Sequence, residues 1–291
     1  MKTKVVLSYI FLCIIWGTTW IILKKSLIEG TPPFFGAGLR FFLAGLILWV
    51  FILYKKELPP FSLLSIKIYF QFGVLNLAIS YGLTYWATQY IYSSLSSIIW
   101  SGFPITVAVF SHFMLPDESI TKKKIISLIL GTIGAIFVLS NNLSLLGNKI
   151  AIGIAMVILA VIIASYPSVY LKKYNANIRS THINAVSQII AGALLLIISF
   201  LTEAHKEMNW SNYNIFALAY LTIPGSIIAW SIYIWLYSYI SMAQISYIAF
   251  FPPLIASLLG WIILEETLSL ITIVGGIMII IGTILVYSDH N

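Results

Sequence analysis

The sequence predicts an all-α integral membrane protein of ten transmembrane helices, arranged as two inverted repeats of five helices each. Composition is the first reason: of the 291 residues, 60% are hydrophobic and 9% are charged, whereas soluble proteins carry about 25% charged residues. The lengths of the apolar runs are the second reason, because runs of about 20 residues cross about 30 Å of hydrocarbon as helices. A match between the two halves of the chain is the third.

Short polar linkers with turn signals, such as Thr31-Pro32-Pro33 and Asn141-Asn142, separate the apolar runs. The first run resembles a signal peptide, but it has no small-residue cleavage site, so we expect a retained helix. The lone Cys13 excludes an internal disulfide. In chain order, the predicted spans are residues 5–23, 34–53, 66–84, 93–115, 125–140, 150–170, 183–201, 215–235, 243–264 and 270–287.

The two halves match each other at a constant separation of 148 residues. Across this separation Lys24-Lys25 pairs with Lys172-Lys173, Arg40 with Gln188, Tyr85 with Tyr233, Pro104 with Pro252, and Glu118 with Glu266. Each half holds five predicted spans, and an odd number makes the halves enter the membrane from opposite sides. The sequence therefore predicts an inverted repeat, with residues 1–142 and 149–291 as its units, of the kind that encloses a midplane site in secondary transporters.

Basic residues predict the orientation. With the N-terminus in the cytoplasm, eleven basic residues lie inside and four outside, and Arg40 lies within a span. The positive-inside rule therefore places both termini of a multi-pass membrane protein in the cytoplasm. The inner set is Lys2, Lys4, Lys55, Lys56, Lys67, Lys122, Lys123, Lys124, Lys172, Lys173 and Arg179, and the outer set is Lys24, Lys25, Lys149 and Lys206.

Several motifs follow one another in a fixed order. The first span carries WGTTW and then a lysine pair, and the second carries PPFFGAGLRFFLAGLIL. A proline followed by a glutamate occurs in the stretch SSLSSIIWSGFPITVAVFSHFMLPDESIT, and FFPPLIASLLGWIILEETLS repeats this order in the second half. GTIGAIFVL and GGIMIIIGTILV are glycine-bearing spans. In this order the motifs resemble the drug/metabolite transporter superfamily, in its EamA branch of bacterial ten-span permeases, over essentially the whole chain.

The resemblance implies a basket of two five-helix repeats and an alternating-access cycle that exports small metabolites. The two halves differ at one matched position, where the first half has Arg40 and the second half has Gln188. No Asp or Glu lies deep in a predicted span, so the likeness does not extend to the embedded proton-coupling glutamate of small multidrug exporters. We expect a neutral or zwitterionic substrate with apolar character, such as an amino acid. A multidrug or aromatic-compound exporter and an importer stay open.

Polar and aromatic side chains recur at helical spacing on repeat-matched spans, which predicts that they face a central cavity. Packing and interfacial roles compete with this interpretation for serines and for tryptophans near span ends. The predicted cavity residues are Trp16, Thr19, Trp20, Asn76, Ser80, Tyr81, Tyr85, Trp100, Ser101, Tyr166, Trp230, Tyr233, Gln244 and Tyr247.

A second group of residues is predicted to gate or shape the helices. Arg40 could reach the interface, bind a substrate carboxylate or bond to carbonyls of a broken helix, and we favour a structural or gating role. Gln188 at the matching position supports a shared structural role. Glu118 and Glu266 precede spans and suit helix N-termini. Pro104 and Pro252 interrupt spans and suit hinges.

The sequence argues against other classes of protein. Intramembrane catalysis needs paired acids, a metal cluster or an activated nucleophile, and the spans contain none of these patterns. We therefore expect no enzyme, no cofactor and no metal site. The charge of +7 reports topology and not nucleic-acid binding. The expected partners are the lipid bilayer and a small-molecule substrate, and the expected state is a monomer. A membrane scaffold or sensor is the non-transport alternative.

Overall fold

The computed structural model describes residues 2–91, 93–116, 118, 120–139, 148–174, 178–204, 206–255, 258 and 270–288. These residues are helical apart from short turns and linkers, and none of them lies in a strand. The elements are α1 (Lys2–Ile28), α2 (Pro33–Lys55), α3 (Leu63–Gln71), η1 (Phe72–Ser80), α4 (Tyr81–Thr88), α5 (Ser93–Trp100), α6 (Phe103–Met114), α7 (Lys122–Leu139), α8 (Asn148–Tyr174), α9 (Ser180–Thr202), α10 (Asn212–Thr222), η3 (Ile223–Ile228), α11 (Ala229–Leu236), α12 (Met242–Ser246), η4 (Tyr247–Phe250) and α14 (Leu270–Ser288).

Seven helices in the described part of the chain are long and apolar enough to cross a bilayer. Each coincides with a predicted span, and several are built from consecutive elements in line: Thr3–Ile28, Pro33–Lys55, Leu63–Thr88, Leu95–Met114, Lys149–Tyr174, Ser180–Thr202 and Asn212–Leu236. The remaining predicted spans contain α7, which begins with three lysines, and two shorter apolar helices, Met242–Ile255 and Leu270–Val286. The chain is thus an all-helical membrane protein.

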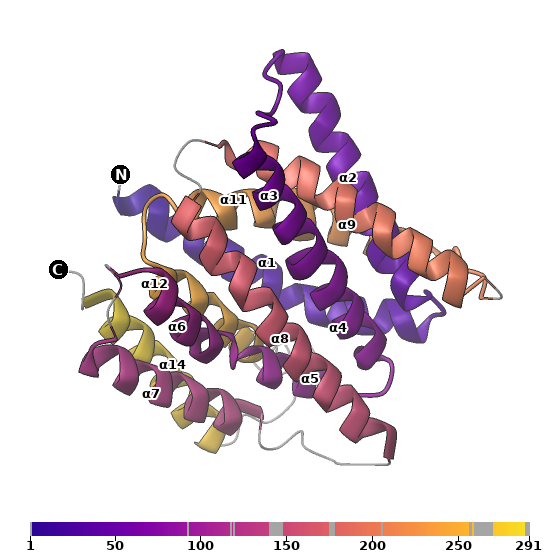
Figure 1. The fold of residues 1–291 in the computed structure, drawn as a ribbon. Coiled ribbons are helices and arrows are strands. Elements are labelled where there is room, and N and C mark those ends of the chain that lie inside the picture. The colour runs from indigo at the N-terminus through magenta and orange to yellow at the C-terminus, as the bar shows by residue number, and fades with distance from the viewer. Residues whose placement is uncertain are drawn as a thin grey trace.

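Two helix pairs lie on separate sides of the bundle. α2 packs along α9, and α7 packs along α14, at positions well separated in Figure 1. Glycines permit the close approach: a Cβ on Gly134 would lie 2.6 Å from the carbonyl oxygen of Gly275, and a Cβ on Gly38 would lie 2.9 Å from the main-chain nitrogen of Leu196. In membranes, such small residues let helices gain dispersion contacts along their backbones.

The centre of the bundle is formed by helices from both halves of the chain. α1 packs against α11, α5 and η4, while α8 packs against η1, α4 and α6. The main apolar core joins these elements and includes Leu12, Phe72, Ala164 and Ile234. Residues far apart in sequence therefore meet at this centre, where the cavity described below lies.

The helices around the centre are interrupted in related places. η1 and η3 are π-helical segments within two of the spans, a form often found at functional sites. In η3, Pro224 has no main-chain N–H, and the Ser226 hydroxyl donates to the Leu221 carbonyl at 2.9 Å. The predicted span over residues 93–115 corresponds to the candidate membrane helix Leu95–Met114, which a turn at Ser101-Gly102, just before Pro104, divides into α5 and α6. In the second half, the 3₁₀ segment η4 lies between α12 and Pro252.

The first helix extends beyond the predicted span of residues 5–23. α1 continues one turn past its lysines to Ile28. The Lys24 ammonium donates to the carbonyl oxygens of Thr88 at 2.6 Å and Ile91 at 3.0 Å, at the C-terminal end of α4. Lys24 thus satisfies helix carbonyls that would otherwise lack donors.

Candidate functional site

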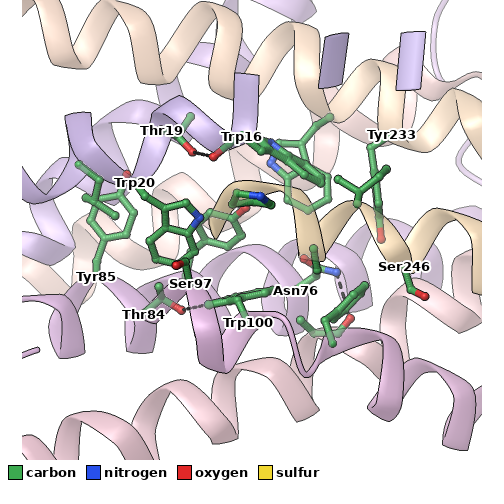
Figure 2. A pocket seen from close by; sticks show the side chains of 18 of the residues that line it. Trp16, Thr19, Trp20, Asn76, Thr84, Tyr85, Ser97, Trp100, Tyr233 and Ser246 are labelled. Carbon is green, nitrogen blue, oxygen red and sulfur yellow. Dashed lines mark hydrogen bonds between the residues drawn. The ribbon is translucent and has the colours of Figure 1, made fainter. Parts of the chain in front are cut away.

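A cavity of about 90 Å³ lies at the centre of the bundle. A water needs about 10–15 Å³ of such space, so the cavity has room for a small organic solute. Figure 2 shows Trp16 and Trp20 from α1 facing Trp100 from α5, with Asn76, Thr84 and Tyr233 around them. The described residues that line it are Trp16, Thr19, Trp20, Leu23, Arg40, Asn76, Tyr81, Thr84, Tyr85, Ser97, Trp100, Phe103, Ala164, Trp230, Tyr233, Ile245, Ser246, Ile248, Ala249 and Pro252.

An aromatic cluster forms much of the wall. The Trp16 ring lies 5.1 Å from the rings of both Trp230 and Tyr233, measured between centroids. Tyr81 lies 6.0 Å from Trp230 and 6.1 Å from Trp100. Two of these contacts are edge-to-face and two are tilted, and together they fix the ring positions in a largely apolar wall. The wall therefore suits a solute with an apolar part.

Arg40 supplies the positive charge of the cavity. It is 3% exposed and lies on α2. Its Nε donates to Ser226 Oγ at 2.7 Å, one terminal nitrogen donates to the Tyr85 hydroxyl at 3.0 Å, and the other donates to the Gly225 carbonyl at 3.0 Å. Ser226 and Gly225 belong to the π-helical η3, so Arg40 ties α2 to an interrupted helix while lining the cavity.

Asn76 presents an acceptor. Its amide nitrogen donates to the Ala164 carbonyl at 3.1 Å and to Ser168 Oγ at 2.8 Å. A main-chain carbonyl can only accept, which fixes the orientation of the amide group. Because the amide nitrogen faces these two acceptors on α8, the side-chain oxygen is the group that Asn76 can offer to a solute.

Five residues predicted for the cavity lie outside it. Ser101 instead donates to the Ile98 carbonyl at the turn between α5 and α6. Gln244 forms a capping box with Ser241 at the start of α12. The other residues that require this correction are Ser80, which is fully buried beside α4, Tyr166, which packs on Phe110 and Tyr170, and Tyr247, which packs on Phe250. The remaining nine predicted cavity residues line the cavity.

The predicted gating residues have different positions. Arg40 and Pro252 line the cavity, whereas Pro104 and Glu118 line a smaller cavity beside it. Glu118 caps a helix, but the helix is α12 and not the following α7: its carboxylate accepts from the Met242 nitrogen at 2.8 Å and the Ala243 nitrogen at 3.4 Å. Glu266 lies outside the described residues.

Gln188 is buried behind the cavity and not in its wall. Its side-chain nitrogen donates to Asn184 Oδ1 and to the Ser226 carbonyl, the latter at 3.3 Å. Gln188 therefore bonds to the same π-helical segment as Arg40.

Sequence reasoning missed several lining residues. Thr84 accepts a hydrogen bond from the Trp100 indole nitrogen at 3.2 Å and so orients that ring. Ser97 lies on the same helical stripe as Trp100, but a serine on a span more often serves packing. Phe103 begins α6, beyond the turn at Ser101-Gly102. Ile245, Ile248 and Ala249 carry no polar signal that would separate them from core residues. Among the described residues, no group of His, Cys, Asp or Glu side chains suits a metal ion.

Comparison with known proteins identifies the family. The EamA-like transporter family matches twice, at residues 3–140 and 151–288. The uncharacterized transporter YoaV of Bacillus subtilis is 25% identical over 96% of this chain and 95% of its own length. An S-adenosylmethionine/S-adenosylhomocysteine transporter of Chlamydia trachomatis is 30% identical over 95% of this chain and 86% of its own length.

The fold has a counterpart among solved structures. One crystal structure superposes with a TM-score of 0.80, covering 98% of this chain and 96% of its own length at 16% identity, which supports the fold alone. The family match spans nearly the whole chain in two copies, and the helices surround a solute-sized cavity. This protein therefore belongs to the EamA-like transporter family.

Proposed function

We propose that this transporter exports small metabolites of the amino-acid type across the bacterial cytoplasmic membrane, by alternating access of one central site. The observation that carries the proposal is the cavity, which combines aromatic faces with a cationic donor, Arg40, and an amide acceptor, Asn76. A zwitterion with an apolar side chain is complementary to all three features.

The proposed architecture is ten crossings in two inverted repeats, residues 1–142 and 149–291. The two family matches support it, because each falls within one unit. Helix pairing supports it as well: α2 with α9 and α7 with α14 are equivalent helices at the 148-residue separation. α1 of the first half contacts α11 of the second half, and α8 of the second half contacts α4 of the first half. α1 is equivalent to α8 and α4 to α11, so a two-fold relation between the halves requires both contacts. Alternating access by rocking of two halves follows from this plan.

The proposed orientation places both termini in the cytoplasm, from the lysine distribution. In that orientation Trp16, Trp20 and Leu23 lie along the outer half of α1, and the Glu118 contact with α12 lies at the cytoplasmic side. The cavity then extends from Leu23 in the outer half of α1 to Ile245 and Ser246 of α12 at the cytoplasmic side.

The Chlamydia relatives suggest how the substrate could be larger. S-adenosylmethionine and S-adenosylhomocysteine carry an amino-acid end on a longer group, so the same polar pair could hold that end. A multidrug or aromatic-compound exporter would use the aromatic wall and little else. Loss of Arg40 would therefore weaken binding of an amino-acid end but would change binding to the aromatic wall little.

A flux assay tests the proposal. The purified full-length protein is placed in sealed proteoliposomes, and exchange of labelled amino acids, S-adenosylmethionine and S-adenosylhomocysteine is measured against empty liposomes. We expect saturable exchange of at least one amino-acid-type solute. Absence of saturable flux for every solute class, with folded protein, would exclude transport and leave a scaffold or sensor.

A ligand-stabilisation screen locates the site, because binding to the folded state raises thermal stability. We expect Trp230→Ala and Trp20→Ala to abolish the stabilisation by any solute found. Equal binding by these folded variants would place the site elsewhere.

A further inference from the structure

Resting on the transport function proposed above, we infer that the cavity recognises its substrate by a carboxylate group, which Arg40 binds, while the unsatisfied indole N–H groups of Trp16 and Trp230 make the surrounding wall rich in hydrogen-bond donors. The carboxylate is thus the required group on the substrate, and a positive charge is not. Each residue contributes a separate observation.

Among the residues that the structure describes, no acidic side chain pairs with the buried Arg40. In the described part of the chain, the ion pair that forms joins Arg179 to Glu57, two exposed side chains, and does not involve Arg40. The hydrogen-bond partners of Arg40 are two neutral hydroxyls and a carbonyl. A buried charge without a counterion is costly and usually marks a function. An anion entering the cavity would neutralise it.

Arg40 also retains unused donors. A guanidinium group has five N–H donors, and three of them make the bonds to Ser226, Tyr85 and Gly225. The other two N–H groups have no partner among the described residues, and Arg40 lines the cavity. Two N–H donors on a planar fork match the two oxygens of a carboxylate. The bonds to η3 and α4 therefore hold the fork in place and leave part of it for a ligand.

Two indole N–H groups are unsatisfied in the same neighbourhood. The nitrogens of Trp16 and Trp230 are buried and have no hydrogen-bond partner among the described residues, although both side chains line the cavity. An indole nitrogen can donate but not accept. The Tyr81 ring lies near both Arg40 and Trp230: its centroid lies 5.6 Å from the Arg40 guanidinium carbon and 6.0 Å from the centroid of the Trp230 ring. Trp100, by contrast, has its N–H bonded to Thr84.

The lining as a whole favours acceptors on the ligand. Among the described residues, none that lines the cavity is acidic. A primary amine without a carboxylate would therefore meet the Arg40 charge with no carboxylate to offset it. The acceptor identified above, the Asn76 oxygen, can take an N–H of a zwitterion but carries no full charge. The lining therefore favours an oxyanion on the ligand over an amine.

The test compares ligands that differ only in these groups. One set is L-phenylalanine, 3-phenylpropanoate, L-phenylalaninamide and phenethylamine, and a second set is L-leucine, 4-methylpentanoate, L-leucinamide and 3-methylbutylamine. Binding to the purified full-length protein is measured by thermal stabilisation and by quenching of tryptophan fluorescence. We expect the acids to bind about ten- to a hundred-fold more tightly than the matched amide and amine.

Variants separate recognition from structure. Arg40→Gln should abolish the preference for acid over amide, Arg40→Lys should keep part of it, and Arg179→Gln, which also removes one positive charge, should leave it unchanged. A purely structural Arg40 would lower stability without changing the preference. If Arg40→Gln does not fold, the pair Trp16→Phe and Trp230→Phe keeps the rings, removes both N–H donors and should reduce the preference, with exposed Trp210→Phe as the control.

The outcomes are distinct for the two proposals. Equal binding of amide, amine and acid, or an unchanged preference in Arg40→Gln, overturns carboxylate recognition while flux can still support transport. Binding by no member of either set also overturns it, and the proteoliposome assay then decides separately whether transport fails.

Discussion

Arg40 and Gln188, which occupy matching positions 148 residues apart, both donate hydrogen bonds to Ser226. Arg40 Nε reaches the Ser226 hydroxyl at 2.7 Å, and the Gln188 side-chain nitrogen reaches the Ser226 carbonyl at 3.3 Å. The paired helices α2 and α9 therefore converge on one residue of the π-helical η3. The arginine adds its charge to the cavity, while the glutamine adds only a neutral donor behind it.

The Ser226 hydroxyl should stabilise this junction. Ser226→Ala leaves Arg40 Nε–H unpaired in a buried site, so we expect a loss of about 1–3 kcal/mol, seen as a lower apparent unfolding temperature in detergent. Thr222→Val is the matched control, because the Thr222 hydroxyl is buried without a hydrogen-bond partner among the described residues. Equal shifts in the two variants would contradict this role for Ser226.

Close approach of α2 and α9 depends on Gly192. A Cβ at this position would lie 2.6 Å from Phe42 Cα, in the backbone of α2, so Gly192→Ala must push the helices apart. We expect a loss of about 1–3 kcal/mol from overpacking, measured by thermal unfolding. Gly82→Ala is the control, since its new Cβ would first meet the terminal Leu195 Cδ2 at 3.0 Å, which can move. A Gly192→Ala variant as stable as Gly82→Ala would show that α2 and α9 can accommodate the added Cβ without separating.

The sequence predicted the helices and much of the cavity because both depend on local patterns. Apolar runs of membrane length set the positions of the long helices. A 3.6-residue period placed Trp16 and Trp20 on one face of α1, and that face does line the cavity. The period held there because α1 is an uninterrupted α-helix.

The period failed where a helix is interrupted. The turn at Ser101-Gly102 changes the register between α5 and α6, so Ser101 turns from the cavity face to the Ile98 carbonyl. Gln244 lies in a first turn, where its side chain caps Ser241 instead. Glu118 capping α12 joins residues 124 positions apart, and no spacing rule in the sequence indicates such a contact.

Lys24 should contribute more to stability than its neighbour. Its ammonium group donates to Thr88 and Ile91, and the matching Lys172 donates to Tyr237 and Ile240 at the end of α11. Lys24→Met leaves the α4 carbonyls without these donors, and we expect a loss of about 1.5–3 kcal/mol in thermal unfolding. Lys25→Met, which removes only a cation–π contact with Tyr213 at 4.2 Å, should cost less. The reverse order would contradict the capping role.

Chemical labelling should reveal the orientation. In a Cys13→Ala background, which removes the one native thiol, single cysteines replace exposed Lys55 and Lys206. We expect an impermeant maleimide applied to intact spheroplasts to label position 206 and not position 55, because the lysine distribution places only the first outside. Labelling of position 55 alone would reverse the proposed orientation.

Glu118 should hold the cavity closed on its own side. Ser246, on α12, lines both the central cavity and the smaller cavity that contains Glu118, so α12 separates the two spaces. The Glu118 carboxylate anchors α12 through the nitrogens of Met242 and Ala243. Glu118→Ala removes this anchor, and we expect a cysteine at position 246, in the Cys13→Ala background, to react several-fold faster with an impermeant maleimide in inside-out vesicles.

The matched control for this gate is Glu203→Ala. Glu203 caps α2 through the nitrogens of Phe34 at 3.3 Å and Phe35 at 3.0 Å, so its loss removes a comparable cap from a helix that does not separate the two cavities. Each variant should lose about 1 kcal/mol of stability, but only Glu118→Ala should speed labelling at position 246. Faster labelling in both variants would mean that general loosening, and not release of α12, exposes the cavity.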